Sequence, residues 1–290
     1  MKQSWLSYFR ANQAEPQEIP WDEVSPPSED VGWFLIPSLQ QFQLGEGARG
    51  VTFLTLGRRH AEATGDFDFV ETLALFIAEE QRHSALLARY LRAIGATLVE
   101  RDWVDSVFRK LRKLAGLECM VTVLVTAEIV AIPYYRSVMK LTDCPALKAV
   151  CRRILREEAK HLLFQASTLR RLQRTGRGGV ETRTRNPAAA SVVRWIRGEQ
   201  RRPAGWVRFI RVVQQVFMTG TCITVWAEHR RVLKGGGTDF LRFALECRAL
   251  LRHVQKLSGR PEVFHEPTST AHCDESVAHL SHNDNFRVPS

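Results

Sequence analysis

The 290-residue sequence has no CxxC pair among its six cysteines, and its apolar stretches are short or interrupted by charged or polar residues. The missing pairs exclude a rubredoxin-type iron centre and a zinc ribbon. The two longest apolar stretches, 120–135 and 212–226, are shorter than the ~20 residues of a span, so we expect buried helices there. Because the first residues also lack the apolar core of a secretory signal, we expect a cytoplasmic protein with reduced thiols.

The sequence also lacks the alternating pattern of β-strands, and its apolar residues recur with helical spacing instead. With 44% hydrophobic and 25% charged residues, the composition is that of a globular protein. We therefore predict an all-α fold. The expected long helices cover 38–64, 68–94 (with Asp68 as the favoured cap), 116–141, 145–174, 204–233 and 239–258, and the short ones 103–114 and 190–199.

These elements suggest four segments. Residues 1–34 are expected to form a helix and an irregular arm, which packs onto the body through Trp5, Tyr8, Trp21 and Trp33. Residues 35–177 are expected to form a four-helix bundle, and 178–258 additional C-terminal helices packed on it. Residues 259–290 lose periodicity and are expected to be a flexible tail.

The chain carries a net charge of +10, mostly from clustered arginines such as "RKLRK" at 109–113. A basic surface of this kind can attract nucleic acid, an anionic membrane or an acidic carrier protein. Because the clusters lie on the polar sides of helical patterns, a solvated arginine-rich face is the simpler interpretation. Nucleic acid is not expected as a partner.

One short motif, Glu-Glu-x-x-His, occurs twice in stretches with helical spacing: "EEQRH" at 79–83 and "EEAKH" at 157–161. Residues three apart project from the same side of a helix, so each Glu-x-x-His pair can hold one ion. Both pairs lie on apolar stripes and should face the core. A third Glu-x-x-His, at 262–265, lies between prolines, which shows that this spacing alone is weak support for a metal site.

Two isolated glutamates complete the pattern. Glu128 is the only charged residue from Cys119 through Tyr135, so its carboxylate should be buried. A buried carboxylate without a partner is costly, and a metal ion removes that cost. Glu46 occupies the matching place in the first long helix, where Gly45, Gly47 and Gly50 should permit close helix approach.

The resulting order of Glu, ExxH, Glu, ExxH, one element on each long helix, resembles the ferritin-like di-iron carboxylate proteins. The resemblance covers about residues 38–175. It implies a ferritin-like four-helix bundle with additional C-terminal helices, and two iron ions or a manganese/iron pair as cofactors. It also implies catalytic carboxylates that are themselves metal ligands, together with one histidine for each ion: Glu46, Glu80, His83, Glu128, Glu158 and His161.

The first glutamate of each Glu-Glu-x-x-His motif, Glu79 or Glu157, has two interpretations. The resemblance implies that Glu157 hydrogen-bonds His83 and that Glu79 hydrogen-bonds His161, which would fix the histidine tautomers. The alternative is a solvated surface glutamate. For the whole set, the alternative to a metal site is a bundle whose buried acids pair with arginines such as Arg49 or Arg82.

The resemblance further implies an oxidoreductase that uses O2 or peroxide to hydroxylate or desaturate an apolar or carrier-bound substrate. An external reductase or ferredoxin would supply electrons, an acidic carrier protein could deliver the substrate, and a homodimer is one expected assembly. The alternative is a ferroxidase or peroxide scavenger without an organic substrate. Leu87, Ile154, Ala131 and Ile132 stand where particular branches of the family place tyrosine, histidine or threonine, so the branch stays open.

Overall fold

The computed structural model describes residues 4–15, 18–47, 50–100, 116–175 and 206–259. Within these ranges the fold is all-α and contains no strand. The helices predicted at 103–114 and 190–199, and the predicted tail from residue 260 on, lie outside the described residues. The described helices are α1 (Trp5–Ala14), the 3₁₀ turn η1 (Trp21–Glu23), α2 (Glu29–Glu46), α3 (Val51–Thr64), α4 (Asp68–Ala93), α6 (Leu117–Leu141), α7 (Pro145–Thr175), α9 (Trp206–Gly235) and α10 (Phe240–Gly259).

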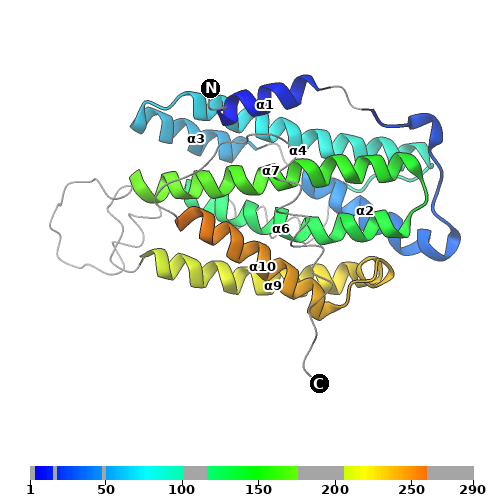
Figure 1. Cartoon of the computed structure of the whole chain (residues 1–290). Helices are drawn as coiled ribbons and strands as arrows, with labels where there is room; N and C mark the ends of the chain where they lie inside the picture. Colours follow the sequence, from blue (N-terminus) through cyan, green and yellow to red (C-terminus); the bar gives the residue numbers. More distant parts are fainter. Residues whose placement is uncertain (1–3, 16–17, 48–49, 101–115, 176–205, 260–290) are drawn as a thin grey trace.

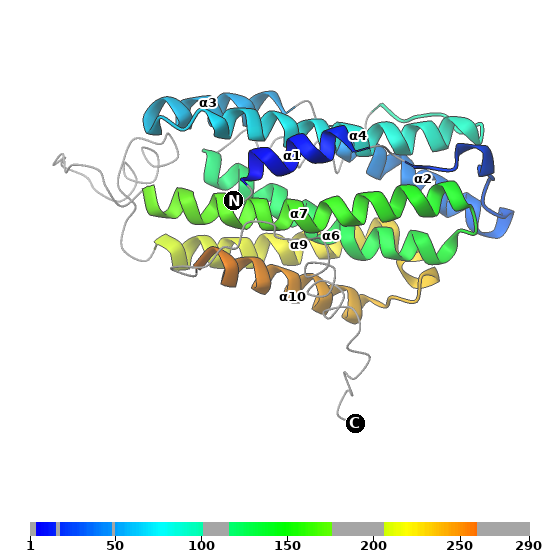
Figure 2. The same ribbon diagram turned by 45° about the horizontal axis from the view of Figure 1, so that its top comes forward.

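The long helices lie roughly along one direction in layers (Figure 1). Helices α1, α3 and α4 form the upper layer, α6 and α7 the middle, and α9 and α10 the lower layer; the turned view keeps this order (Figure 2). Helix α4 packs against α1, α2, α3 and α7, while α6 packs against α7, α9 and α10. Apolar residues on the facing sides of these helices fill the core. The space between α4 and the α6–α7 pair is therefore the interior of the protein.

Helix α6 is the central element. It is long and apolar enough to cross a membrane by composition, but most of its apolar stretch is buried inside the protein. A core helix of a soluble protein has the same properties, which agrees with the buried helix predicted at 120–135. The cytoplasmic location itself stays a prediction.

The first predicted long helix, 38–64, is wrong as a single element. The structure has α2 ending at Glu46 and α3 beginning at Val51. Gly50 caps α3 with φ of +63°, a left-handed conformation that favours glycine. A Cβ on Gly50 would come within 2.4 Å of Ile77 on α4, so this glycine permits close helix approach as predicted. At Gly45 a Cβ would meet no atom within 4 Å, and the prediction of close approach is wrong there.

The N-terminal arm also differs from the prediction. Helix α2 begins at Glu29, so the end of the segment expected to be irregular is helical. Two acidic residues in its first turn, Glu29 and Asp30, stabilise the start of α2, because the N-terminus of a helix carries a partial positive charge. The prolines of the arm had suggested an irregular chain as far as residue 34.

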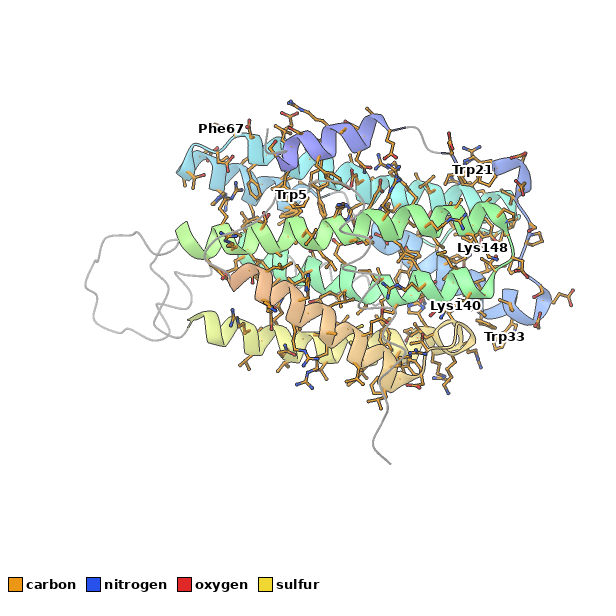
Figure 3. The ribbon with its side chains drawn as sticks, viewed as in Figure 1. Trp5, Trp21, Trp33, Phe67, Lys140 and Lys148 are labelled. Carbon is orange, nitrogen blue, oxygen red and sulfur yellow. The ribbon has the colours of Figure 1, made fainter. Side chains whose placement is uncertain are left out.

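All four aromatic residues expected to anchor the arm contact the body. The indole N–H of Trp5 donates to Ser167 Oγ on α7 over 3.1 Å, and Figure 3 shows this side chain pointing from α1 toward α7. Tyr8 is half-buried beside it, and Trp21 lies under the guanidinium of Arg89. Trp33 is 57% exposed at the end of the bundle, yet the guanidinium of Arg231 on α9 lies over its ring at 4.2 Å, so this residue contacts the body as well.

The other long helices agree with the prediction to within two residues at each end. The cap of α4 is an exception. Asp66, and not Asp68, accepts the hydrogen bond from the backbone N–H of Phe69, at 3.2 Å, and Asp68 is the first helical residue. The side chain that caps the helix therefore belongs to Asp66, two residues before the helix begins, and the prediction of Asp68 as the cap is wrong.

Candidate metal centre

All six residues predicted as metal ligands come together between the layers. Glu46 is the last residue of α2, while the two Glu-x-x-His pairs lie in the middle of α4 and α7, and Glu128 lies in the middle of α6. They form two groups whose ligand-type atoms lie within 4.8 Å of one another. The first group is Glu46, Glu80, His83 and Glu158, and the second is Glu80, Glu128, Glu158 and His161. Glu80 and Glu158 belong to both.

The Nδ1 atom of each histidine faces the carboxylates. His161 Nδ1 lies 2.9 Å from Glu80, 3.4 Å from Glu128 and 3.6 Å from Glu158. His83 Nδ1 lies 3.4 Å from Glu158 and 4.0 Å from Glu80. The two imidazole centroids are 5.6 Å apart, so the two groups are neighbours and could share ligands.

The cluster is withdrawn from solvent. His83 and His161 are fully buried, and Glu46, Glu128 and Glu158 are buried as well. Glu80 is the least covered of the six, with 16% of its side chain exposed. Four carboxylates in such a position repel one another and lose their hydration, which is unfavourable without a cation.

Several polar atoms that face this space have no hydrogen-bond partner among the described residues. They are Glu80 Oε1, His83 Nδ1, Glu128 Oε2, Glu158 Oε2 and His161 Nδ1. Buried polar atoms are nearly always hydrogen-bonded, so a group of unpaired ones requires an explanation. Each of these atoms is a type that ligates metal ions, and the donor set fits a metal ion bound between them.

The Nε2 atom of each histidine is hydrogen-bonded to the first glutamate of the other Glu-Glu-x-x-His motif. His83 Nε2 donates to Glu157 Oε2 over 2.6 Å, and His161 Nε2 donates to Glu79 Oε2 over 3.0 Å. Glu157 and Glu79 are both buried, so the predicted cross-pairing is confirmed and the solvated alternative is wrong. Because a carboxylate accepts hydrogen bonds, the proton is placed on Nε2 and the Nδ1 lone pair is left toward the cluster.

Arginine has a different role from the one that the alternative interpretation gave it. Arg82 contacts Glu157 at 2.6 Å and Glu79 at 3.5 Å. Among the described residues no arginine forms an ion pair with Glu46, Glu80, Glu128 or Glu158. The guanidinium therefore balances the acids that orient the histidines, and among the described residues no arginine balances the central carboxylates. Arg49 lies outside the described residues.

Some partners of the cluster were missed in the sequence. Tyr135 donates to Glu46 over 2.8 Å, and Gln165 donates to Glu128 over 2.6 Å. Gln165 lies four residues after His161, and Tyr135 lies seven residues after Glu128, so helical spacing could have suggested both. Asn12 on α1 donates to Glu79 and Glu157, and nothing in the sequence pointed to it.

The electrostatics follow from burial and crowding. Burial, together with the charges of Glu80 and Glu158, raises the pKa of Glu46 and of Glu128 well above the ordinary value. Burial alone would also raise the pKa of Glu158, but contacts with Glu128, His161 and His83 hold it well below its usual range. One carboxylate is thus kept ionised while two neighbours compete for protons.

The pKa values of the two histidines are raised, although burial alone would lower them. Burial alone lowers the pKa of His83, but its contacts with Glu157 and Glu158 outweigh burial and raise the pKa to about 10. The pKa of His161 is also raised well above its ordinary value, because contacts with Glu128, Glu158, Glu79 and Glu80 outweigh its burial. Without a metal ion, the cluster therefore compensates part of its negative charge by binding protons.

A cavity of about 260 Å³ lies between α2 and α9. Ser38 and His229 line it, and none of the six predicted ligands does. His229 Nδ1 and the hydroxyl of Tyr134 are both hydrogen-bonded to Ser38 Oγ, at 2.9 and 2.8 Å. His229 is therefore a buried histidine with a hydrogen-bond partner.

Comparison with known proteins adds no relative. No protein-family model, no curated protein and no solved structure matches this chain. What the sequence and structure establish is an all-α protein with a buried cluster of glutamates and histidines that could hold a metal ion.

Proposed function

We propose that this protein is an oxidoreductase of the ferritin-like di-iron class, with two iron ions or a manganese/iron pair bound by the six clustered residues. The observation that carries the proposal is the set of buried, unpaired ligand-type atoms on α4, α6 and α7, with Glu46 of α2 grouped beside them. The glutamates of α2 and α6 and the Glu-x-x-His pairs of α4 and α7 match the donor arrangement of that class.

The donor chemistry favours iron or manganese. Each group offers three carboxylates and one imidazole, and Glu80 and Glu158 are common to both. Oxygen-rich sites with a single imidazole suit iron or manganese better than zinc, which prefers nitrogen and sulfur ligands. A pair of such ions supplies redox chemistry toward O2 or peroxide.

The surrounding residues have definable tasks in such a centre. His83 and His161 would each bind one ion through Nδ1, because Nε2 is committed to Glu157 or Glu79. Tyr135 holds Glu46 in place through its hydroxyl proton, and Gln165 holds Glu128 through its amide. The Phe76 ring, 4.6 Å from that of His161, helps to exclude water.

The proposed reaction is oxidation of an apolar or carrier-bound organic substrate, by hydroxylation or desaturation. Helices α9 and α10 support this choice, because they add a layer that a four-helix storage protein does not need. Residues 211–259 carry eight Arg and Lys side chains, all exposed, against three acids, and such a surface suits an acidic carrier or an electron-donating ferredoxin. A homodimer and a cytoplasmic location stay predictions.

The second candidate is an iron-binding ferroxidase or peroxide scavenger. It would use the same six residues and needs no substrate pocket beside them; the cavity between α2 and α9, which none of the six lines, does not itself supply such a pocket. For an organic substrate, we propose access to the metals between α4, α6 and the C-terminal helices.

Iron loading followed by exposure to air separates the two candidates. Protein loaded anaerobically with Fe(II) and then given air should develop a discrete metal-based absorption band in either case. For the proposed oxidase, further Fe(II) should be left largely unoxidised by the protein. Turnover of many Fe(II) equivalents with retention of ferric mineral would favour the ferroxidase and contradict the organic-substrate proposal.

A further inference from the structure

We propose that Asn12, on the N-terminal helix α1, is a positioning residue for both histidines of the metal centre and that it acts more strongly on His161 than on His83. The inference rests on the metal centre proposed above. Asn12 belongs to none of the four helices that carry the candidate ligands, yet it bridges the two acids that orient the histidines.

The amide of Asn12 is fully committed. This residue is only 6% exposed, and its Nδ2 atom donates to Glu79 Oε1 over 2.5 Å and to Glu157 Oε1 over 2.6 Å. A primary amide has two N–H groups, so each carboxylate receives one. The amide oxygen accepts from Arg153 Nη2 at 3.0 Å, which fixes the direction in which the amide points.

Each carboxylate uses its other oxygen for a histidine. Glu79 Oε2 accepts from His161, and Glu157 Oε2 accepts from His83. By holding both Oε1 atoms, Asn12 restricts the rotation of both carboxylates and with it the orientation of both imidazoles. Partners of this kind set the basicity and orientation of metal-bound histidines.

The two acids do not depend on Asn12 equally. Glu157 Oε1 also contacts Arg82 and the Nε atom of Arg153, each at 2.6 Å. The corresponding oxygen of Glu79 has Arg82 at 3.5 Å as its other charged contact among the described residues. When Asn12 is removed, Glu157 therefore keeps two close cations and Glu79 keeps one distant one, so the Glu79–His161 side should respond more strongly.

Helix α1 is held in place by contacts away from Asn12. Phe9 is fully buried with its ring 6.2 Å from that of His161, and Trp5 donates to Ser167 on α7. At the surface, Arg10 forms an ion pair with Glu71 at 2.6 Å. If Asn12 served only to dock α1, its loss would disturb both histidines or neither.

The test uses Co(II) as the metal and NMR as the readout. In protein loaded with Co(II), the exchangeable Nε2 proton of each metal-bound histidine should give its own paramagnetically shifted signal. His83→Gln and His161→Gln assign the two signals. In Asn12→Leu, which is close in volume and has no donor, the His161 signal should shift or be lost through exchange with water, while the His83 signal stays. Co(II) binding at the position that includes His161 should weaken about tenfold.

Two further variants keep the test decisive. Asn12→Ser, which leaves room for water, takes the place of Asn12→Leu if that variant fails to fold. Arg10→Ala removes a surface contact of α1 and should leave both signals unchanged. Three results would overturn the proposed role of Asn12 and leave the proposed metal centre standing. They are unchanged signals in the Asn12 variants, equal loss of both signals, and the same change in Arg10→Ala. If the wild-type protein takes up no Co(II), the metal centre and this inference both fail.

Discussion

At the scale of single residues, Glu128 is the most informative side chain. It is 4% exposed, one of its oxygens accepts from Gln165, and the other has no hydrogen-bond partner among the described residues. A carboxylate in this setting either binds a proton or binds a cation. The same choice faces Glu46 across the cluster, and a metal ion satisfies both residues at once.

We predict that Glu128→Ala abolishes metal binding at the position that it shares with His161. Because Glu80 and Glu158 belong to both positions, binding at the neighbouring position should weaken as well. Elemental analysis of the purified variant should find at most about one ion per chain, against about two in the wild-type protein. Glu71→Ala, a change at the exposed partner of Arg10, is the matched control and should retain the wild-type content. Full occupancy in Glu128→Ala would contradict the assignment.

The buried histidines predict how the stability of the metal-free protein depends on pH. The pKa of His83 is about 10 in the folded protein against an ordinary 6.5, and that of His161 is also raised. The folded state therefore binds more protons than the unfolded state between these values, so the free energy of unfolding should fall as the pH rises from about 6.5 to about 10. Chemical denaturation at several pH values measures this slope.

Metal loading supplies the comparison for that slope. A metal ion on Nδ1 displaces the proton, so the loaded protein should lose much of the pH dependence over the same range. Equal slopes for the metal-free and loaded proteins would contradict metal binding at the Nδ1 atoms of these histidines.

The residues that could be predicted from the sequence are those with a local signal. The six ligand candidates lie at fixed helical spacing on apolar faces, and the doubled acids flank them directly. Asn12 has no such signal, because its partners Glu79 and Glu157 lie 67 and 145 residues away along the chain. Only the packing of α1 against α4 brings it to the centre.

At the scale of elements, the break between α2 and α3 determines where Glu46 lies. Helical periodicity continues through residues 38–64 and gives no sign of a break, but Gly50 adopts a left-handed conformation. Glu46 thus sits at the C-terminal end of α2 and not inside a continuous helix. The glycines did signal close approach, but sequence alone could not tell which of them ends a helix.

We predict that Gly50→Ala destabilises the protein by about 2–4 kcal/mol. A positive φ costs an alanine about 1–2 kcal/mol, and displacing the Ile77 side chain, 2.4 Å from the added Cβ, adds about 1–2 kcal/mol. Thermal or denaturant unfolding measures the loss.

Two glycines provide matched controls for Gly50. Gly65 also has a positive φ, of +77°, but its Cβ would meet no atom within 4 Å, so Gly65→Ala should cost only about 1–2 kcal/mol. Gly45 lies within α2 in open space, and Gly45→Ala should be neutral or stabilising by up to about 1 kcal/mol. If all three variants were equally stable, the close approach of α3 to α4 at Gly50 would be contradicted.

At the scale of the whole molecule, the helices form layers in which α1 and α4 lie on one side of the α6–α7 pair and α9 with α10 on the other (Figure 1). The lengths of α4, α6, α7, α9 and α10 follow from helical periodicity and could be predicted closely. Which helices touch could not, because contacts such as that of α6 with α9 join segments far apart in the sequence. Oligomeric state and partners depend on surfaces whose basic charge allows several binding modes.

The number of metal ions bound per chain tests the central claim most directly. Wild-type protein loaded anaerobically with Fe(II) and freed of excess metal should contain about two ions per chain by elemental analysis. Two ions would occupy the two overlapping groups that share Glu80 and Glu158. A content near zero after loading with Fe(II), and again after loading with Mn(II), would contradict the account.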